Sequence, residues 1–244
     1  MHWASILLAG DGIAIDAPSL ARDAGTALPP RDAQPSIPPG AESRRDDRLQ
    51  LPITKRPEES GTSVRGVMVA IARASDHTRA LVPLRANWTR ESVLEVVELC
   101  RRRPQWNAVP LANVRTGRLW GSRLPLLDAL EWLAGSDVAP PAPDWDVGHF
   151  VTIAATLDGP ARSLLVIRDS YPQFGWDGHH LQPPEALAAG LDRGDGREGG
   201  IALYVADRDR PDVEVAAKDV GFQLDGWDNG SPQPSGLDEG GANR

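Results

Sequence analysis

The feature that most constrains the fold is a pair of apolar segments joined by a turn, between residues 148 and 168. The first segment, Gly148 to Leu157, is rich in β-branched residues, and the second runs from Ser163 to Arg168. Asp158-Gly159 lies between them and is a strong turn signal. The pattern predicts two antiparallel strands that form a β-hairpin.

Helical signals dominate the chain before this hairpin. The clearest helix spans Thr89 to Arg103, with Thr89 as its N-cap and Pro104 after its end. Its apolar residues at 93, 96, 97 and 100 share one face at helical spacing. Further helices are expected at 3–9, from the N-cap Asp16 to Gly25, at 124–133 and at 185–191, and further strands at 64–72 and 200–206. Helices followed by an antiparallel sheet predict the α+β class.

Composition divides the chain into four parts. Residues 1–28 are expected to form the N-terminal helices, and 64–224 the main α+β domain. Residues 29–63 contain many prolines among charged residues, which predicts a disordered insertion because such a stretch buries little apolar area. Residues 225–244 are rich in Gly, Pro and Asn, which predicts a disordered acidic tail.

Charge and cysteine content narrow the classes of protein. The net charge is −8, and residues 181–244 carry most of it, with thirteen acidic and six basic residues. This balance disfavours nucleic acid and anionic membrane as partners. No apolar run is long enough to span a membrane or to form a signal peptide, and the basic residues are almost all arginine, which is typical of a GC-rich bacterial genome. A single cysteine excludes an internal disulfide and a cysteine-based zinc site and favours a cytoplasmic location.

A candidate pair of functional residues lies at the base of the hairpin. If the loop is the three residues Asp158-Gly159-Pro160, residue 157 pairs with 161, and His149 then lies directly opposite Asp169 on one face. A two-residue loop would shift the register by one and place Asp169 off that face. A carboxylate beside an imidazole fixes its tautomer, as in nucleophilic catalysis. The alternative is a surface His–Asp pair without a catalytic role.

The residues around this pair resemble a known family. The run Gly148-His149-Phe150-Val151, followed by an apolar strand and by Asp169-Ser170-Tyr171-Pro172, resembles the His and Asp motifs of papain-like cysteine peptidases, and among them the bacteriocin-processing peptidases. The family pattern has Asp-Pro where this chain has Asp-Ser-Tyr-Pro. The resemblance covers roughly residues 145–206. It implies a papain-like architecture, with N-terminal helices packed on a small antiparallel sheet, and a peptide or protein substrate.

The resemblance also implies a nucleophilic cysteine at the start of the first helix and a glutamine just before it. Neither is present, because the expected helix begins at Met1-His2-Trp3. A gene start placed too late and a pseudo-enzyme without a nucleophile both explain this absence. The expected protein is therefore peptidase-like, with His149 as base and Asp169 as its orienting partner, and inactive as given. A non-catalytic peptide-binding module that uses the same cleft is the alternative.

Three other features complete the candidates. Cys100 lies on the apolar face of a helix, which predicts a buried core thiol. Asp177, His179 and His180 carry ligand types that suit a metal ion, and a metal-dependent hydrolase that uses His149, Asp169 and His179 is a further alternative, although no metal or cofactor is expected. The tryptophans at 88, 106, 120, 145 and 176 are expected to pack in the core, with an aromatic groove as the other possibility.

Overall fold

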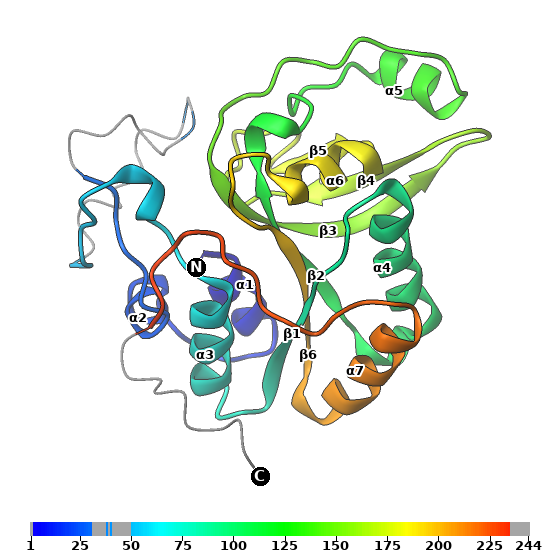
Figure 1. Cartoon of the computed structure of the whole chain (residues 1–244). Coiled ribbons are helices and arrows are strands. Elements are labelled where there is room, and N and C mark those ends of the chain that lie inside the picture. Colours follow the sequence, from blue (N-terminus) through cyan, green and yellow to red (C-terminus); the bar gives the residue numbers. More distant parts are fainter. Residues whose placement is uncertain (1, 31–37, 39, 41–49, 235–244) are drawn as a thin grey trace.

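The computed structural model describes residues 2–30, 38, 40 and 50–234, and it shows a mixed α/β fold (Figure 1). Its strands are all antiparallel to their neighbours and follow the order β1-β6-β2-β3-β4-β5. The strands are β1 (Arg79–Leu84), β2 (Val109–Arg115), β3 (Gly148–Asp158), β4 (Ser163–Arg168), β5 (His179–Gln182) and β6 (Gly200–Ala206). The helices are α1 (His2–Gly10), α2 (Ala17–Asp23), α3 (Val64–Ala74), α4 (Arg90–Arg102), α5 (Leu126–Leu133), α6 (Pro184–Asp192) and α7 (Arg210–Asp219), with short 3-10 turns at 57–59, 104–106, 116–118 and 207–209.

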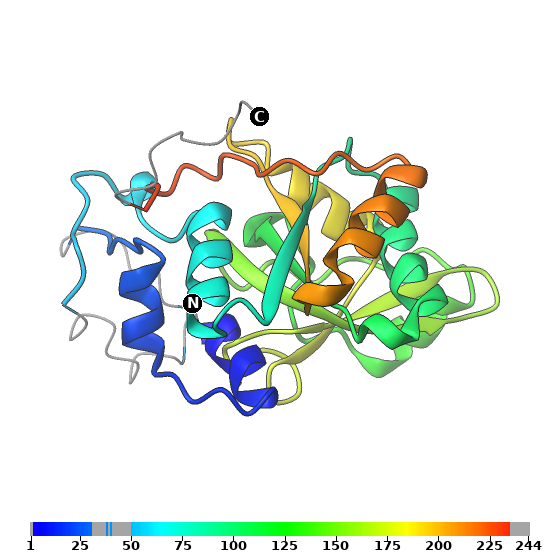
Figure 2. The ribbon, with the colours of Figure 1, turned by 90° about the horizontal axis from the view of Figure 1, so that it is seen from below.

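Helices cover both faces of the sheet. Helices α1, α2 and α3 lie on one side, and α4 and α7 lie on the other (Figure 2). Two buried apolar clusters correspond to these layers, one between the sheet and α1–α3, the other between the sheet and α4, α6 and α7. Successive residues of a strand point to opposite faces, so Phe150 joins the first cluster while Val151 joins the second.

Side-chain caps account for several helix boundaries. Asp16 accepts a hydrogen bond from the Ser19 backbone N–H and begins α2, as the sequence predicts. Thr89 and Ser92 form a reciprocal capping box at the start of α4. Each cap satisfies backbone N–H groups that have no partner within the helix.

The predicted strand at 64–72 is wrong, because this segment is helix α3. Ser63 accepts a hydrogen bond from the Gly66 N–H and caps the helix, and Val64, Val67 and Ile71 bury one face at helical spacing. The alternation of Val67, Val69 and Ile71 is misleading, since Val69 is only partly buried. Burial against α1 and α2 therefore overrides the β-branched composition.

The β3–β4 hairpin forms with a different loop from the predicted one. Asp158 pairs with Ser163, so four residues rather than three connect the strands. A β-bulge between Ile153 and Ala155 then shifts the register by one residue, and below it Thr152 pairs with Arg168. Without the bulge, the longer loop would send the side chain at 169 to the other face. The bulge restores the parity that the sequence analysis assumed.

Parts of the two segments expected to be disordered have defined contacts. Trp227 is buried, packs over Gly200 and donates from Nε1 to Asn113 Oδ1 at 3.2 Å. Asn229 Nδ2 donates to the Thr62 carbonyl oxygen at 2.9 Å. Residues 62, 227 and 229 thus make defined contacts within segments that the sequence predicts to be disordered. Residues 31–37, 39, 41–49 and 235–244 lie outside the described residues.

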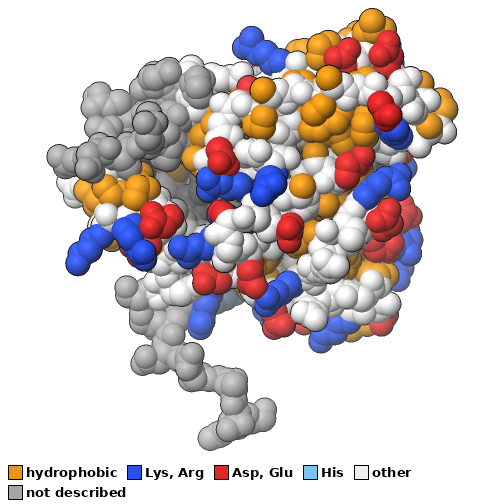
Figure 3. All heavy atoms as spheres, turned by 45° about the horizontal axis from the view of Figure 1, so that its top comes forward, with side chains coloured by type: hydrophobic (Ala, Val, Ile, Leu, Met, Phe, Trp, Pro, Cys, Tyr) orange, Lys and Arg blue, Asp and Glu red, His pale blue; other side chains and the backbone are white. Residues whose placement is uncertain are grey.

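Helix α5 keeps an apolar face toward solvent. Ala129 and Trp132 are buried against β4 and β5, while Leu126, Leu127 and Leu130 are exposed. Hydrophobic surface is visible at the top of the molecule, where α5 lies (Figure 3). None of the helices in the described part of the chain is long and apolar enough to cross a lipid bilayer.

Candidate functional site

His149 and Asp169 are in direct contact. The distance from His149 Nε2 to Asp169 Oδ1 is 3.0 Å, and the same oxygen accepts the Tyr171 backbone N–H at 2.9 Å. The side chains are 14% and 3% exposed, so the carboxylate is covered and the imidazole keeps limited access. The predicted proximity is confirmed, although the predicted register is not.

The backbone around the pair explains how the contact forms. The β3–β4 ladder ends at Thr152 and Arg168, and the same register continued by one residue would place Asp169 opposite Val151, two residues from His149 on the same face. The Asp169 backbone N–H donates to the Gly178 carbonyl oxygen at 2.6 Å and continues the β4 edge past Arg168. The pair is therefore diagonal rather than directly opposite.

The charge on Asp169 fixes the role of the imidazole. Burial raises the pKa of this carboxyl, but the neighbouring His149 and the hydrogen bonds from His149 and the Tyr171 N–H outweigh burial and hold the pKa below its usual range. The carboxylate is ionised at neutral pH and can only accept, so Nε2 of His149 carries a proton. In the neutral imidazole the lone pair is on Nδ1, the atom available to act as a general base.

Aromatic rings surround the imidazole. Trp145 lies 5.2 Å and Tyr171 5.6 Å from the His149 ring centroid, and both contact Phe174. These rings restrict water around the base and hold its orientation. Neither Tyr171 nor Phe174 is predicted from the sequence as a site residue, although Tyr171 lies within the motif that carries the resemblance.

A second histidine, His180, is buried behind Phe174. The Gln182 side chain holds the Trp120 backbone by both ends, because Oε1 accepts the Trp120 N–H at 2.8 Å and Nε2 donates to its carbonyl at 2.7 Å. This fixes the amide orientation, and Nε2 also lies 3.1 Å from His180 Nδ1, which must therefore accept. Burial lowers the pKa of His180 to about 4, against a smaller opposing effect of Asp169.

The first helix lies close to the end of β4. The Trp3 ring, in the first turn of α1, is 5.9 Å from the guanidinium carbon of Arg168, which precedes Asp169. Trp3 also shares a buried cluster with Phe150, the residue after His149. Phe150 and Arg168 thus face the layer of α1, whereas His149 and Asp169, the adjacent residues of the chain, point to the opposite face of the sheet.

Cys100 is poorly suited to be a nucleophile. It lies on α4 and packs against the apolar core, and burial raises the pKa of its thiol to about 11. A thiol with this pKa is almost entirely protonated at neutral pH. The predicted core position agrees with this packing.

The suggested metal ligands are not brought together. Arg168 Nη1 donates to His179 Nε2 at 3.1 Å, so the ring nitrogen that a metal would need is occupied. His180 alternates to the other face of β5 and is buried, while Asp177 lies in an exposed turn. Within the described residues, no group of three His, Cys, Asp or Glu side chains could hold a metal ion.

The tryptophans do not line one groove. Trp106 and Trp88 pack with the α4 side of the sheet, Trp120 packs with α5, and Trp145 packs beside His149. Trp176 is largely exposed. Core packing therefore accounts for most of these rings, as the sequence analysis expects.

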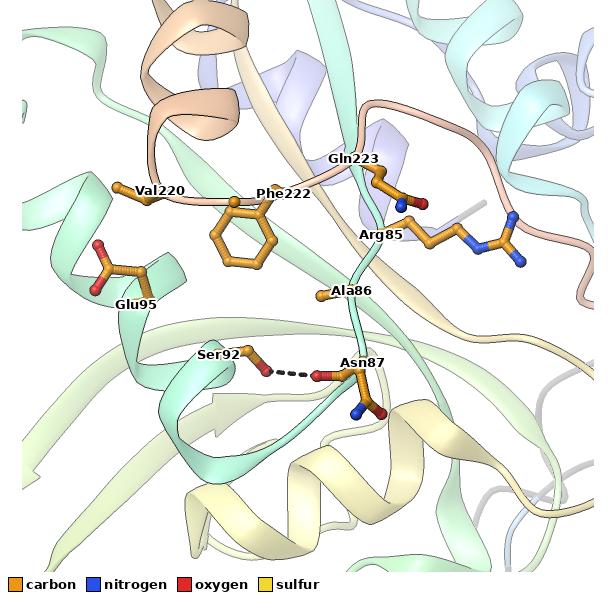
Figure 4. Close-up of a pocket in the computed structure, with 9 residues that line it drawn as sticks. Arg85, Ala86, Asn87, Ser92, Glu95, Val220, Phe222 and Gln223 are labelled. Atoms are coloured by element: carbon orange, nitrogen blue, oxygen red, sulfur yellow. Dashed lines mark hydrogen bonds between the residues drawn. The ribbon is translucent and has the colours of Figure 1, made fainter.

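Two hollows accompany these features. One, of about 440 Å³, is lined by Gly40, Arg123, Asp144, Gln173 and Phe174, and Phe174 connects it to the aromatic rings around His149. The larger one, of about 600 Å³, lies between the start of α4 and the segment after α7, with Phe222 pointing into it (Figure 4). The residues that line the larger hollow do not include His149, Asp169 or the aromatic rings around them. Of the two hollows, the smaller one is therefore the one connected to the candidate site.

The chain is thus a mixed α/β protein in which a partly buried histidine contacts a buried carboxylate beside aromatic rings. A model described as a family of unknown function (DUF6885) matches residues 1–228, so the chain belongs to this family. No curated protein and no solved structure matches the chain.

Proposed function

We propose that this protein is a papain-like, cysteine-peptidase-type protein in which His149 is the general base and Asp169 orients it. The observation that carries the proposal is the 3.0 Å contact between His149 Nε2 and the buried carboxylate, which leaves Nδ1 as the proton acceptor. The helices α1–α3 on one face of an antiparallel sheet support the papain-like architecture. The substrate class is a peptide or protein amide.

The chemistry requires a thiol that this chain does not supply. In a cysteine peptidase the thiol transfers its proton to the imidazole as the sulfur attacks the carbonyl carbon, and the imidazolium then protonates the leaving amine. Cys100 is the only cysteine in the sequence, and its pKa is raised by burial. We therefore propose that the chain by itself does not hydrolyse peptides. We also propose that the protein is cytoplasmic, because the free thiol of Cys100 suits a reducing compartment.

The test adds the thiol before the beginning of α1, which is where the resemblance to the cysteine peptidases places it. A series of extensions before Met1 places one cysteine at each of four successive positions. The rate of iodoacetamide labelling against pH then gives the thiol pKa for each. In at least one position we expect a pKa lowered from about 8.5 to below about 7.

His149→Ala in the same extended chain is the control, and it should return the thiol pKa to about 8.5. If every position labels with an ordinary thiol pKa, or if His149→Ala changes nothing, His149 is not positioned as the base. Peptide turnover by the unextended chain that disappears in His149→Ala would overturn the proposed inactivity.

A non-catalytic peptide-binding module is the second candidate. The aromatic rings beside His149 and the hollow next to Phe174 favour it, because both features bind without a nucleophile. In that case the extended chains would show no shifted thiol pKa while peptide binding persists.

A further inference from the structure

The hollow beside Phe174 is separated from the His–Asp pair by one layer of aromatic rings. Phe174 lies 5.8 Å from Trp145, and Trp145 lies 5.2 Å from the His149 ring. Gln173 and Phe174 follow Tyr171 in the turn that leaves Asp169. A ligand bound near His149 could therefore continue into this hollow.

One residue that lines this hollow carries an unsatisfied polar atom. Gln173 lines the hollow, and its amide oxygen is buried without a hydrogen-bond partner among the described residues. The hydroxyl of Ser122, next to the lining residue Arg123, is likewise buried and unpartnered. These are two of the four such side-chain atoms in the described part of the chain. A buried acceptor without a donor destabilises the fold, and a ligand N–H can supply the missing donor.

Two charges of opposite sign share the hollow. Asp144 accepts the Ser122 backbone N–H at 2.7 Å, and its carboxylate remains exposed. Arg123 is also exposed and has no ion pair with any described residue. A carboxylate disfavours an anionic ligand and a guanidinium disfavours a cationic one. Together they favour a neutral group that both donates and accepts hydrogen bonds.

We propose that this hollow is a binding subsite for a peptide residue with a carboxamide side chain, asparagine or glutamine. The ligand amide N–H groups bind the Gln173 oxygen and the Asp144 carboxylate, and its carbonyl accepts from Arg123. The Phe174 ring packs against the flat amide. The volume of about 440 Å³ is large enough for a short peptide segment. The inference rests on the proposed peptide-directed function and specifies its preference.

The test measures binding of four capped tripeptides, acetyl-Ala-X-Ala-amide with X as Gln, Leu, Glu or Lys, by NMR titration of the full chain. The Gln peptide should bind about tenfold more tightly than the Leu peptide, because one or two neutral hydrogen bonds are gained. It should also perturb the Gln173 side-chain amide signals. Equal affinity for Gln and Leu, or tighter binding of Glu or Lys, would overturn the proposal.

Matched variants locate the site. Gln173→Leu should remove the preference for Gln, whereas Gln223→Leu, the same change in the larger hollow (Figure 4), should leave it intact. Arg123→Gln, at an exposed position, tests the site without disturbing the core and should weaken the Gln peptide several-fold. A loss of preference in Gln223→Leu, with Gln173→Leu unaffected, would place the site elsewhere.

The outcome is independent of the thiol experiment. A selective Gln peptide without any shifted thiol pKa would refute the catalytic assignment and keep the subsite. A shifted thiol pKa without selective peptide binding would refute the subsite alone.

Discussion

Lowering the pH from 7 to 5 is expected to destabilise this protein through the buried His180. Its pKa in the folded chain is lowered to about 4, because burial penalises the charged ring. The Gln182 Nε2–H that points at His180 Nδ1 adds a geometric reason, since protonation there would set two donors against each other. The folded state therefore favours the neutral ring.

The direction follows from proton binding. The unfolded histidine has a pKa of about 6.5, so between pH 6.5 and 4 the unfolded chain binds more protons than the folded chain. The contribution of His180 to stability is complete above pH 6.5 and is lost as the pH falls toward 4. Between pH 7 and 5 the loss is about 2 kcal/mol in the free energy of unfolding.

Urea denaturation at pH 7, 6 and 5, followed by tryptophan fluorescence, measures this loss. His180→Asn keeps an acceptor near Nδ1 but cannot titrate, so its free energy of unfolding should lack this pH-dependent part. If wild type and His180→Asn lose equal stability between pH 7 and 5, the reasoning about the buried ring is refuted.

Three further outcomes are expected. Asp169→Ala should lower the free energy of unfolding at pH 7 by about 3 kcal/mol, because it leaves two N–H donors without their acceptor. Asp169→Asn should lower it by less than half as much, and equal losses for the two variants in urea denaturation would contradict this. Cys100 should label slowly with iodoacetamide at pH 8 in the native protein and rapidly in urea, and fast native labelling would show an accessible thiolate. Gly175→Ala should lower the free energy of unfolding by at least about 2 kcal/mol more than Gly221→Ala does. Both glycines have positive φ, but only at Gly175 would an added Cβ lie 2.0 Å from a backbone oxygen, that of His179. Similar melting of the two glycine variants would argue against that close approach.

The sequence predicted the elements whose signals are local. The strands at 163–168 and 200–206 agree with β4 and β6, and the helix at 89–103 agrees with α4. Caps and turns depend on a few neighbouring residues, so they are visible in the chain itself. The prediction failed at α3, where β-branched residues face a helical layer, and it did not include β1, β2, β5 or α7.

The contact between His149 and Asp169 was predicted by a register that does not occur. The four-residue loop alone would have separated the pair, and the bulge near Ala155 brought it back to one face. A bulge depends on packing on both sides of a sheet, and no residue of the hairpin predicts it. The correct contact therefore followed from two compensating differences.

The hairpin, the capped helices, the single thiol and the candidate pair His149 and Asp169 are all predicted from the amino-acid sequence. Tertiary structure alone decided that His180 is buried and neutral, that Gln173 leaves an oxygen unpaired, and that Trp227 covers a strand glycine. The physical reason is that caps and turns are made by residues close in the chain, whereas burial and hydrogen-bond satisfaction depend on segments that meet only when the chain folds.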